Sequence, residues 1–198
     1  QVFTKNCNQW RAKDITQDEA QRFRHAVRDS GLLHVIAHDS YLINLASPDD
    51  ALWCRSVDSL VEELRRADSL GIPSVVTHPG AYTTGSEKQG LRRIVRSLNE
   101  IHRRTRAMET QCILETTAGQ GTTLGWRFEQ LGDIQQRVQH PERLGFCLDT
   151  CHVFAAGYPL ATEDEYEATM GEFDRFIGVD KIRVFHFNDS RKELGSRV

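Results

Sequence analysis

In Arg143-Leu-Gly-Phe-Cys-Leu-Asp-Thr-Cys-His152, a short apolar run is followed at once by polar side chains that can bind a metal. The run Gly145–Leu148 is too short for a helix, and it ends at Asp149, with His152 three residues further on. A buried strand that delivers a carboxylate and an imidazole at its carboxyl end is typical of a metal site. The same spacing also suits an aspartate that caps a helix, with a histidine that has no ligand role.

The same pattern recurs along the chain. Short apolar runs, each predicted to be a strand, end at His38, His78, Glu115 and His186, and a further strand is predicted at Val2-Phe3-Thr4. Amphipathic helices are predicted between the strands, at residues 16–30, 48–70, 86–106, about 128–138 and 162–177.

Strands that alternate with helices predict an α/β protein with a parallel sheet. The six strands and five helices fit either a doubly wound sheet or most of a (β/α)8 barrel. The first predicted strand is followed by no glycine-rich dinucleotide fingerprint, which disfavours a nucleotide-binding open sheet. No linker or low-complexity segment divides the chain, so we expect a single domain over residues 1–198.

Five potential ligands, one for each strand after the first, are separated by 40, 37, 34 and 37 residues: His38, His78, Glu115, Asp149 and His186. In a barrel they would lie around one mouth, at the carboxyl ends of the strands. With His152 as a sixth, they predict a metal centre. Imidazoles and carboxylates suit Zn²⁺, with Mn²⁺ or Fe²⁺ as alternatives, and six ligands suit two or three ions. Clustered divalent ions are typical of phosphoester hydrolysis.

The composition of the chain excludes few classes of function. The net charge of −3 gives no overall signature of nucleic-acid binding, so a DNA partner would be bound by local loops or metals. The sequence has no run of 18 apolar residues, so it predicts no membrane span. The five scattered cysteines fit reduced thiols in an intracellular protein. The chain has no initiator methionine and ends without a closing helix, so we expect a fragment lacking both ends of a barrel.

Longer motifs surround the potential ligands. They are His38-Asp-Ser-Tyr-Leu-Ile-Asn44, His78-Pro-Gly80, Glu115-Thr-Thr-Ala-Gly-Gln-Gly121, Asp149-Thr-Cys-His152 with Ala155-Ala-Gly-Tyr158, and His186-Phe-Asn-Asp189 with Gly195-Ser-Arg-Val198. Together they resemble endonuclease IV, the zinc-dependent type 2 AP endonucleases. The resemblance runs from Phe3-Thr-Lys-Asn6 to the last residue.

The resemblance implies a (β/α)8 TIM barrel of the xylose isomerase-like superfamily that holds three zinc ions. It also implies cleavage of double-stranded DNA on the 5′ side of abasic sites, leaving a 3′-hydroxyl and a 5′-deoxyribose phosphate. His38, His78 and Glu115 would hold the first zinc, and Glu115 would bridge to a second that Asp149 and His186 share. His152 would belong to the third zinc, and Glu115 and Asp149 would be the catalytic carboxylates.

DNA-contacting residues follow from the same resemblance. Tyr41 and Leu42 match side chains that are inserted at the abasic site, and unstacking a damaged base costs little. A loop packing pair is the alternative role for these two.

Three departures from the family pattern stand out. Asn8 replaces a wedge arginine, Thr116 replaces the asparagine after the bridging Glu115, and the remaining ligands would follow Val198.

Two other functions remain open from the sequence: a metal-dependent sugar isomerase or epimerase of the same superfamily, and an inactive metal- or DNA-binding remnant. For the complete protein we expect a monomer with no membrane partner. We expect it in the bacterial cytoplasm and nucleoid, or in a eukaryotic nucleus or mitochondrion. We expect the 198-residue chain alone to aggregate or oligomerise and to be weakly active at most, because missing strands leave sheet edges exposed.

Overall fold

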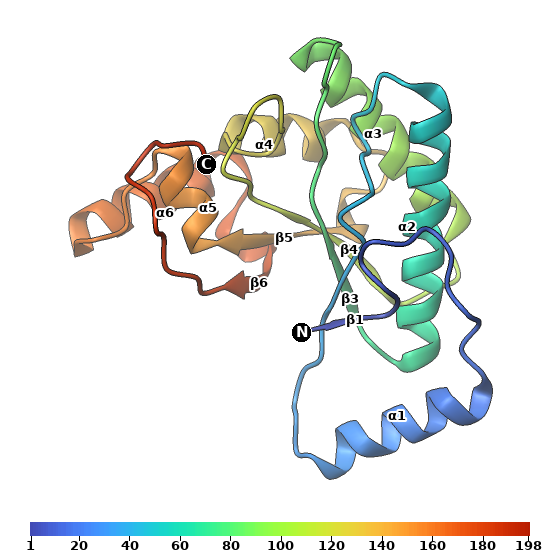
Figure 1. The fold of residues 1–198 in the computed structure, drawn as a ribbon. Helices are drawn as coiled ribbons and strands as arrows, with labels where there is room; N and C mark the ends of the chain where they lie inside the picture. Colours follow the sequence, from blue (N-terminus) through green and yellow to red (C-terminus); the bar gives the residue numbers. More distant parts are fainter.

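A computed structural model describes residues 1–198 as a curled, six-stranded parallel sheet with helices on its outer side (Figure 1). The strands are β1 (Val2–Phe3), β2 (Ala37–His38), β3 (Ser74–Thr77), β4 (Gln111–Glu115), β5 (Leu144–Asp149) and β6 (Ile182–His186). Each strand pairs in parallel with the next one in the chain, giving the order β1-β2-β3-β4-β5-β6. A doubly wound sheet would reverse its strand order at one point, so this order identifies a barrel wall. The sheet is open, because β1 and β6 each have one neighbour.

Helices connect successive strands: α1 (Gln17–Asp29), α2 (Asp50–Leu70), α3 (Glu87–Arg104), α4 (Phe128–Arg137), α5 (Thr150–Ala156) and α6 (Glu163–Phe176). Two short 3₁₀ turns, Pro141–Arg143 and Val179–Lys181, lead into β5 and β6. Capping boxes at Thr16, Ser86 and Thr162 fix three helix starts. No helix has both the length and the apolar character to cross a membrane.

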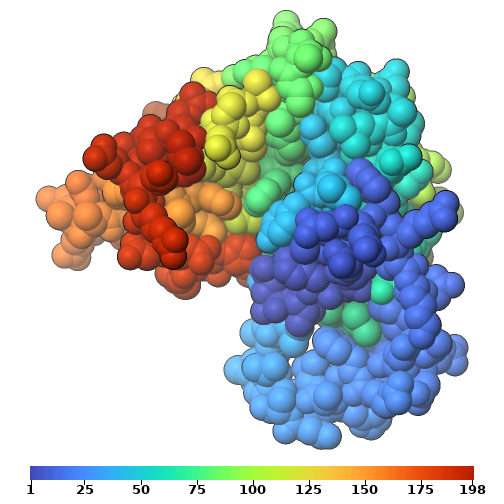
Figure 2. Space-filling model, in the orientation of Figure 1, coloured from blue at the N-terminus to red at the C-terminus, as the bar shows by residue number.

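Two sequence predictions need correction. The apolar run before His38 begins at Leu32, but the strand is only Ala37–His38. Ala37 pairs with Val2 and Val75, close to the starts of β1 and β3, so the residues before Ile36 have no strand beside them. Leu33 is 90% exposed instead, and α1 with the segment after it projects from the body of the molecule (Figure 2). The helix α5 was not predicted, because its seven residues are too few to show a period.

The sheet has apolar residues on both faces. The large core cluster lies between the sheet and the helices. A second, small cluster lies on the inner face: Val76, Ile113, Cys147 and Val184, with Ile36 packed against it. Each of these residues stands two positions before one of the predicted strand-end ligands. Since side chains alternate along a strand, the strand-end ligands point to the same inner face, one layer nearer the mouth.

A buried charged network ties the segment after β1 to α2. The Lys5 and Glu63 side chains are 2% and 1% exposed, with Lys5 Nζ 3.6 Å from Glu63 Oε1. The Thr4 hydroxyl also donates to Glu63, and Lys5 Nζ donates to Ser59 Oγ at 2.8 Å. The Arg66 guanidinium donates to the Thr4 carbonyl at 3.1 and 2.6 Å. Burial raises the pKa of Glu63, although these donors oppose the effect.

One buried histidine predicts a loss of stability in acid. His102 on α3 is 2% exposed, and neither ring nitrogen has a hydrogen-bond partner. Burial, followed by the charge of Arg143, lowers its pKa to about 4, whereas an unfolded histidine titrates near 6.5. Below pH 6.5 the unfolded chain therefore binds a proton that the folded chain does not. The free energy of unfolding should fall by up to about 3 kcal/mol as the pH drops from about 6.5 to about 4.

Urea unfolding at a series of pH values measures this effect. His102→Leu removes both orphaned nitrogens and should flatten the pH dependence over that interval by about the same amount. His25→Leu, at an exposed position on α1, is the matched control and should keep the wild-type pH dependence. If the free energy of unfolding fell equally with pH in wild type and in His102→Leu, His102 would not be the cause of the acid effect.

Candidate metal centre

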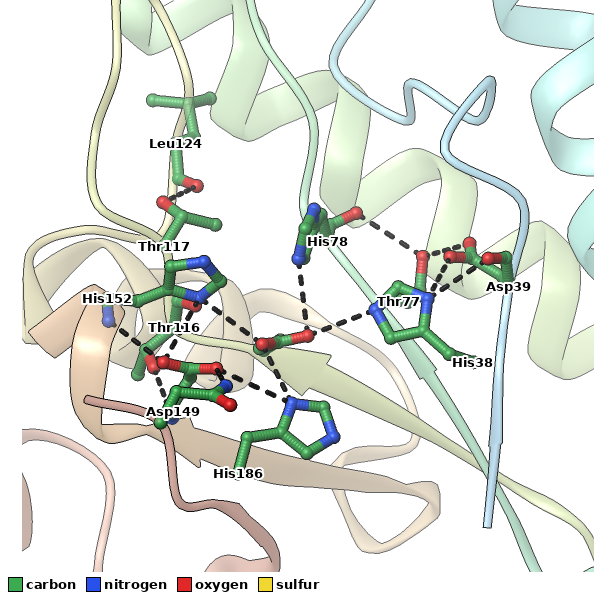
Figure 3. A network of polar contacts seen from close by, with 12 residues as sticks. His38, Asp39, Thr77, His78, Thr116, Thr117, Leu124, Asp149, His152 and His186 are labelled. Atoms are coloured by element: carbon green, nitrogen blue, oxygen red, sulfur yellow. Dashed lines mark hydrogen bonds and ion pairs between the residues drawn. The ribbon is translucent and has the colours of Figure 1, made fainter. Parts of the chain in front are cut away.

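The predicted strand-end side chains meet around one carboxylate, that of Glu115 at the end of β4. Figure 3 shows His38, His78, His152 and His186 gathered around this point. Its Oε2 lies 3.1 Å from His38 Nε2 and 3.2 Å from His78 Nε2. Its Oε1 lies 3.0 Å from His186 Nδ1 and 3.2 Å from His152 Nδ1. Four imidazoles from four different βα units therefore share the two oxygens of one side chain.

This environment determines the charge of Glu115. Burial alone would raise the pKa of the carboxyl group, since the side chain is 2% exposed. Contacts with the four imidazoles outweigh burial and hold the pKa of Glu115 well below its usual range. A buried carboxylate that stays ionised among imidazoles is a ready ligand for a divalent cation.

Strand register explains which side chains come together. Three groups of ligand atoms each lie within 4.8 Å of one another: His38 with His78 and Glu115, Glu115 with Asp149 and His152, and Glu115 with Cys147 and His186. Glu115 is directly opposite Cys147 in the β4–β5 ladder, and Asp149 is opposite His186 in the β5–β6 ladder. Asp149 and His186 therefore lie at the same level, two residues further along their strands than the position opposite Glu115, an offset that fits the stagger of a barrel.

The grouping differs in part from the one that the family resemblance implies. The first group is the same. Asp149, expected beside His186, is grouped with Glu115 and His152, but its two carboxylate oxygens lie at the same distance of 3.8 Å from His152 Nδ1 and from His186 Nδ1. Cys147 was not expected near the ligands. It occupies the position two before Asp149, so the alternation of a strand could have shown it. Burial and the nearby carboxylates raise the pKa of the Cys147 thiol, which disfavours the thiolate.

Polar partners behind the cluster fix its orientation. Asp149 serves as the N-cap of α5, where its Oδ1 accepts the backbone N–H of His152 at 2.9 Å. Its Oδ2 accepts from the side-chain amide of Asn188 at 2.6 Å. Asp39 lies beside His38 Nδ1 at 3.4 Å and accepts from the Thr77 hydroxyl at 2.5 Å. Burial raises the pKa of Asp39 to about 7, and His38 and Thr77 oppose that rise. Asp39 and Asn188 were not predicted as site residues, although they follow His38 and His186 by one and two positions.

Thr116 connects two of the elements that carry ligands. Its hydroxyl accepts the backbone N–H of Asp149 at 2.9 Å, and its carbonyl is 2.8 Å from His152 Nδ1. Thr116 therefore joins the end of β4 to the start of α5.

Thr116→Val should therefore weaken the centre without touching a ligand. The change leaves the buried N–H of Asp149 without an acceptor, at a cost of about 1–3 kcal/mol. Loss of a partner behind a metal ligand typically costs 10–100-fold in metal affinity, which is roughly the loss expected here. Competition with a zinc-sensitive dye measures the affinity. Thr116→Ser keeps the hydroxyl and should bind like wild type, and equal losses in both variants would argue against this role.

The three predicted DNA-contacting residues lie in different places. Tyr41 is 59% exposed, and it lines the cavity of about 560 Å³ at the mouth together with His38 and His78. Leu42 is half-buried, and its N–H donates to Ser40 Oγ at 3.3 Å. Asn8 is exposed and lines a separate groove beside α2. The structure thus brings Tyr41 to the ligand cluster but not Asn8.

The parallel strand order and the histidine–carboxylate cluster at the strand ends indicate a TIM-barrel wall that carries a candidate metal centre. The sequence profile of the family described as "Xylose isomerase-like TIM barrel" matches residues 1–198. Within that class, the chain belongs to the endonuclease IV family.

Individual relatives support this placement. The chain is 46% identical to the "Probable endonuclease 4" of Chloroflexus aurantiacus over all of its residues, covering 70% of that protein. It is 48% identical to the protein of the same name from Geobacter sulfurreducens, covering 67% of it. The crystal structure of endonuclease IV from Thermus thermophilus matches 99% of the chain and 68% of its own length, with a TM-score of 0.85 and 37% identity.

A more distant structure shares the fold alone. A D-tagatose 3-epimerase-like protein matches 88% of the chain and 62% of its own length, with a TM-score of 0.68 and 20% identity. The sugar epimerase alternative is therefore supported by the fold only, whereas the endonuclease IV assignment has sequence identity over the whole chain.

Proposed function

We propose that this protein is a zinc-dependent endonuclease that cleaves double-stranded DNA on the 5′ side of abasic sites, leaving a 3′-hydroxyl and a 5′-deoxyribose phosphate. The observation that carries the proposal is the single carboxylate of Glu115, held among four imidazoles at the mouth of a barrel wall. The similarity to relatives named endonuclease 4 supports DNA as the substrate of that cluster.

The donor set suits divalent metal ions. The three groups around Glu115 offer mainly imidazole nitrogens and carboxylate oxygens, the ligands that zinc prefers at catalytic sites. Nδ1 of His186 faces the carboxylates of Glu115 and Asp149, at 3.0 and 3.8 Å, where it could bind an ion that they share. His38, His78 and Glu115 would hold one ion, with Glu115 shared among further ions that Asp149, His152 and His186 help to bind. Three zinc ions in the complete protein are part of the proposal. Bound zinc would supply Lewis acidity for phosphoester hydrolysis.

The chain's own residues would orient the reacting groups. Glu115 would hold the ions together as the bridging carboxylate, and Asp149 would act beside it. Asp149 is fixed by the Asn188 amide and by its role as N-cap, so that it needs no rearrangement when substrate arrives. Tyr41, at the rim of the cavity, would contact the DNA together with the adjacent Leu42. Asn8, in the separate groove beside α2, would contact the DNA outside the cavity. We also propose that residues 1–198 form a single barrel domain and that the protein is intracellular, because its DNA substrate lies inside the cell.

Chelation and reconstitution test the proposed function. A duplex with one abasic site, labelled at its 5′ end, should be cut into a product with a 3′-hydroxyl, and an undamaged duplex should remain intact. Treatment with a chelator should abolish cleavage, and added Zn²⁺ should restore it. Cleavage that survives complete metal removal would refute the proposal. Epimerisation of a ketohexose with no DNA cleavage would instead support the sugar-enzyme alternative.

A further inference from the structure

A row of polar side chains runs along the exposed side of α3, away from the metal centre. Its members are spaced by four, three, four and three residues, which keeps them on one side of a helix: Arg92, Arg96, Asn99, Arg103 and, in the turn after the helix, Arg106. The buried residues of α3, such as Ile94, Leu98 and Ile101, lie on the other side. The row is therefore not required for packing against the sheet.

This row lines a groove of about 1200 Å³ on the outer surface of the barrel wall, where α3 packs between α2 and α4. Seven arginines line the groove against two carboxylates, those of Asp58 and Glu100, which leaves an excess of five positive charges. The whole chain carries a net charge of −3. Positive charge is thus concentrated in one groove of an otherwise acidic protein.

Several of these arginines have no acidic partner. Arg103 pairs with Glu100 at 2.7 Å and Arg104 with Asp58 at 2.6 Å. The carboxylates of the fold make no such ion pair with Arg92, Arg96 or Arg106. Like charges four residues apart destabilise a helix by a few tenths of a kcal/mol. Glu100, one turn after Arg96, is near enough to be affected by the Arg96 charge, but its ion pair is with Arg103. An anion in the groove would offset the repulsion that remains.

Two further features mark the groove as a binding surface. The Arg96 guanidinium stacks over the Trp53 ring at 4.6 Å, which restrains that side chain at the wall of the groove. The groove also borders His102, whose buried ring nitrogens both lack hydrogen-bond partners. Arg143 is held beside it by a 2.6 Å hydrogen bond to the His102 carbonyl. Cations at fixed positions can bind an anion with little loss of side-chain entropy.

We propose that this groove binds an extended chain of phosphates. The row from Arg92 to Arg106 spans about 20 Å at the helical rise of 1.5 Å per residue, too long for a single phosphate. Guanidinium groups suit phosphate oxygens because they donate two parallel hydrogen bonds. The backbone of a nucleic-acid strand and inorganic polyphosphate share this chemistry. The groove has no lining residue in common with the mouth cavity, so it is a second site, independent of the proposed function.

Binding of two probes to the whole protein tests the proposal: an undamaged DNA duplex and inorganic polyphosphate with the same number of phosphates. The test variant is Arg92→Gln/Arg96→Gln/Arg106→Gln, which removes three exposed cations of the groove that have no acidic partner. The matched control is Arg22→Gln/Arg28→Gln/Arg65→Gln, which removes the same charge at exposed positions outside the groove. NMR shifts of the Trp53 indole N–H and the α3 amides report where each probe binds.

We expect at least one probe to shift the groove signals and to bind the test variant about 10-fold or more weakly, since each exposed contact contributes modestly. The control should bind like wild type. For the duplex, the slope of log affinity against log salt should fall by roughly 2–3 when three phosphate contacts are lost. The probe that binds identifies the source of the phosphates. Cleavage of a short abasic duplex should be unchanged in the test variant, which separates this site from the proposed function. Equal weakening in both variants, or no groove shifts with either probe, would overturn the proposal.

Discussion

Glu115→Gln should abolish both metal binding and DNA cleavage. The substitution keeps the size of the side chain but replaces a carboxylate that contacts four imidazoles with a neutral amide. Every ligand group at the mouth includes Glu115, so one substitution weakens all of them. Loss of a single stabilising contact in a transition state costs about 10²–10³ in rate, so a shared ligand should cost on the order of 10³ or more.

Zinc content and single-turnover cleavage of an abasic duplex measure the two effects together. Glu167→Gln makes the same chemical change at an exposed position on α6 and should leave both quantities at the wild-type level. A Glu115→Gln protein that retained its zinc and cut DNA at the wild-type rate would show that the chemistry lies elsewhere.

Lys5→Met should be the most destabilising of the substitutions considered away from the mouth. It leaves the Glu63 carboxylate buried at 1% exposure without its ammonium partner. Breaking a buried ion pair from one side typically costs about 3–5 kcal/mol. The loss should shrink as the pH falls, because burial already raises the pKa of Glu63 and its protonation removes the uncompensated charge.

The double variant Lys5→Met/Glu63→Leu separates lost pairing from lost packing. It removes both charges, and replacing a buried pair with apolar side chains is often neutral, so most of the stability should return. Lys13→Met breaks an exposed pair with Glu19, where Lys13 is 82% exposed, and should cost less than about 1 kcal/mol. A double variant as unstable as Lys5→Met would mean that the ammonium is needed for its other contacts, with Ser59 and the Trp10 carbonyl.

Strand ends could be predicted from the sequence because a buried parallel strand is a short apolar run that a polar residue follows directly. The structure brings to one mouth the five residues that were placed at such strand ends: His38, His78, Glu115, Asp149 and His186. The length of β2 could not be predicted in the same way. Leu32 and Leu33 are apolar, but a strand needs neighbours in register, and these depend on where β3 begins.

The contacts around the ligands also depend on more than the sequence pattern. Asp149 could be read from the sequence either as a helix cap or as a ligand, and the structure allows both. One carboxylate oxygen accepts the His152 N–H, while the other faces His186. Thr116 follows Glu115 directly, so its side chain leaves the opposite side of the strand end and reaches β5 instead. Contacts between residues of different strands depend on how the strands are aligned, which the pattern of apolar and polar residues does not give.

Anomalous X-ray diffraction at the zinc edge, from crystals of the zinc-loaded protein, tests the metal centre most directly. We expect a peak at about 2.0–2.2 Å from a Glu115 carboxylate oxygen and from imidazole nitrogens of His38 and His78. Further peaks should lie near the other Glu115 oxygen and Asp149. A map with no zinc within bonding distance of Glu115, or with zinc only at surface histidines such as His25 or His140, would show that Glu115 is not at the metal centre.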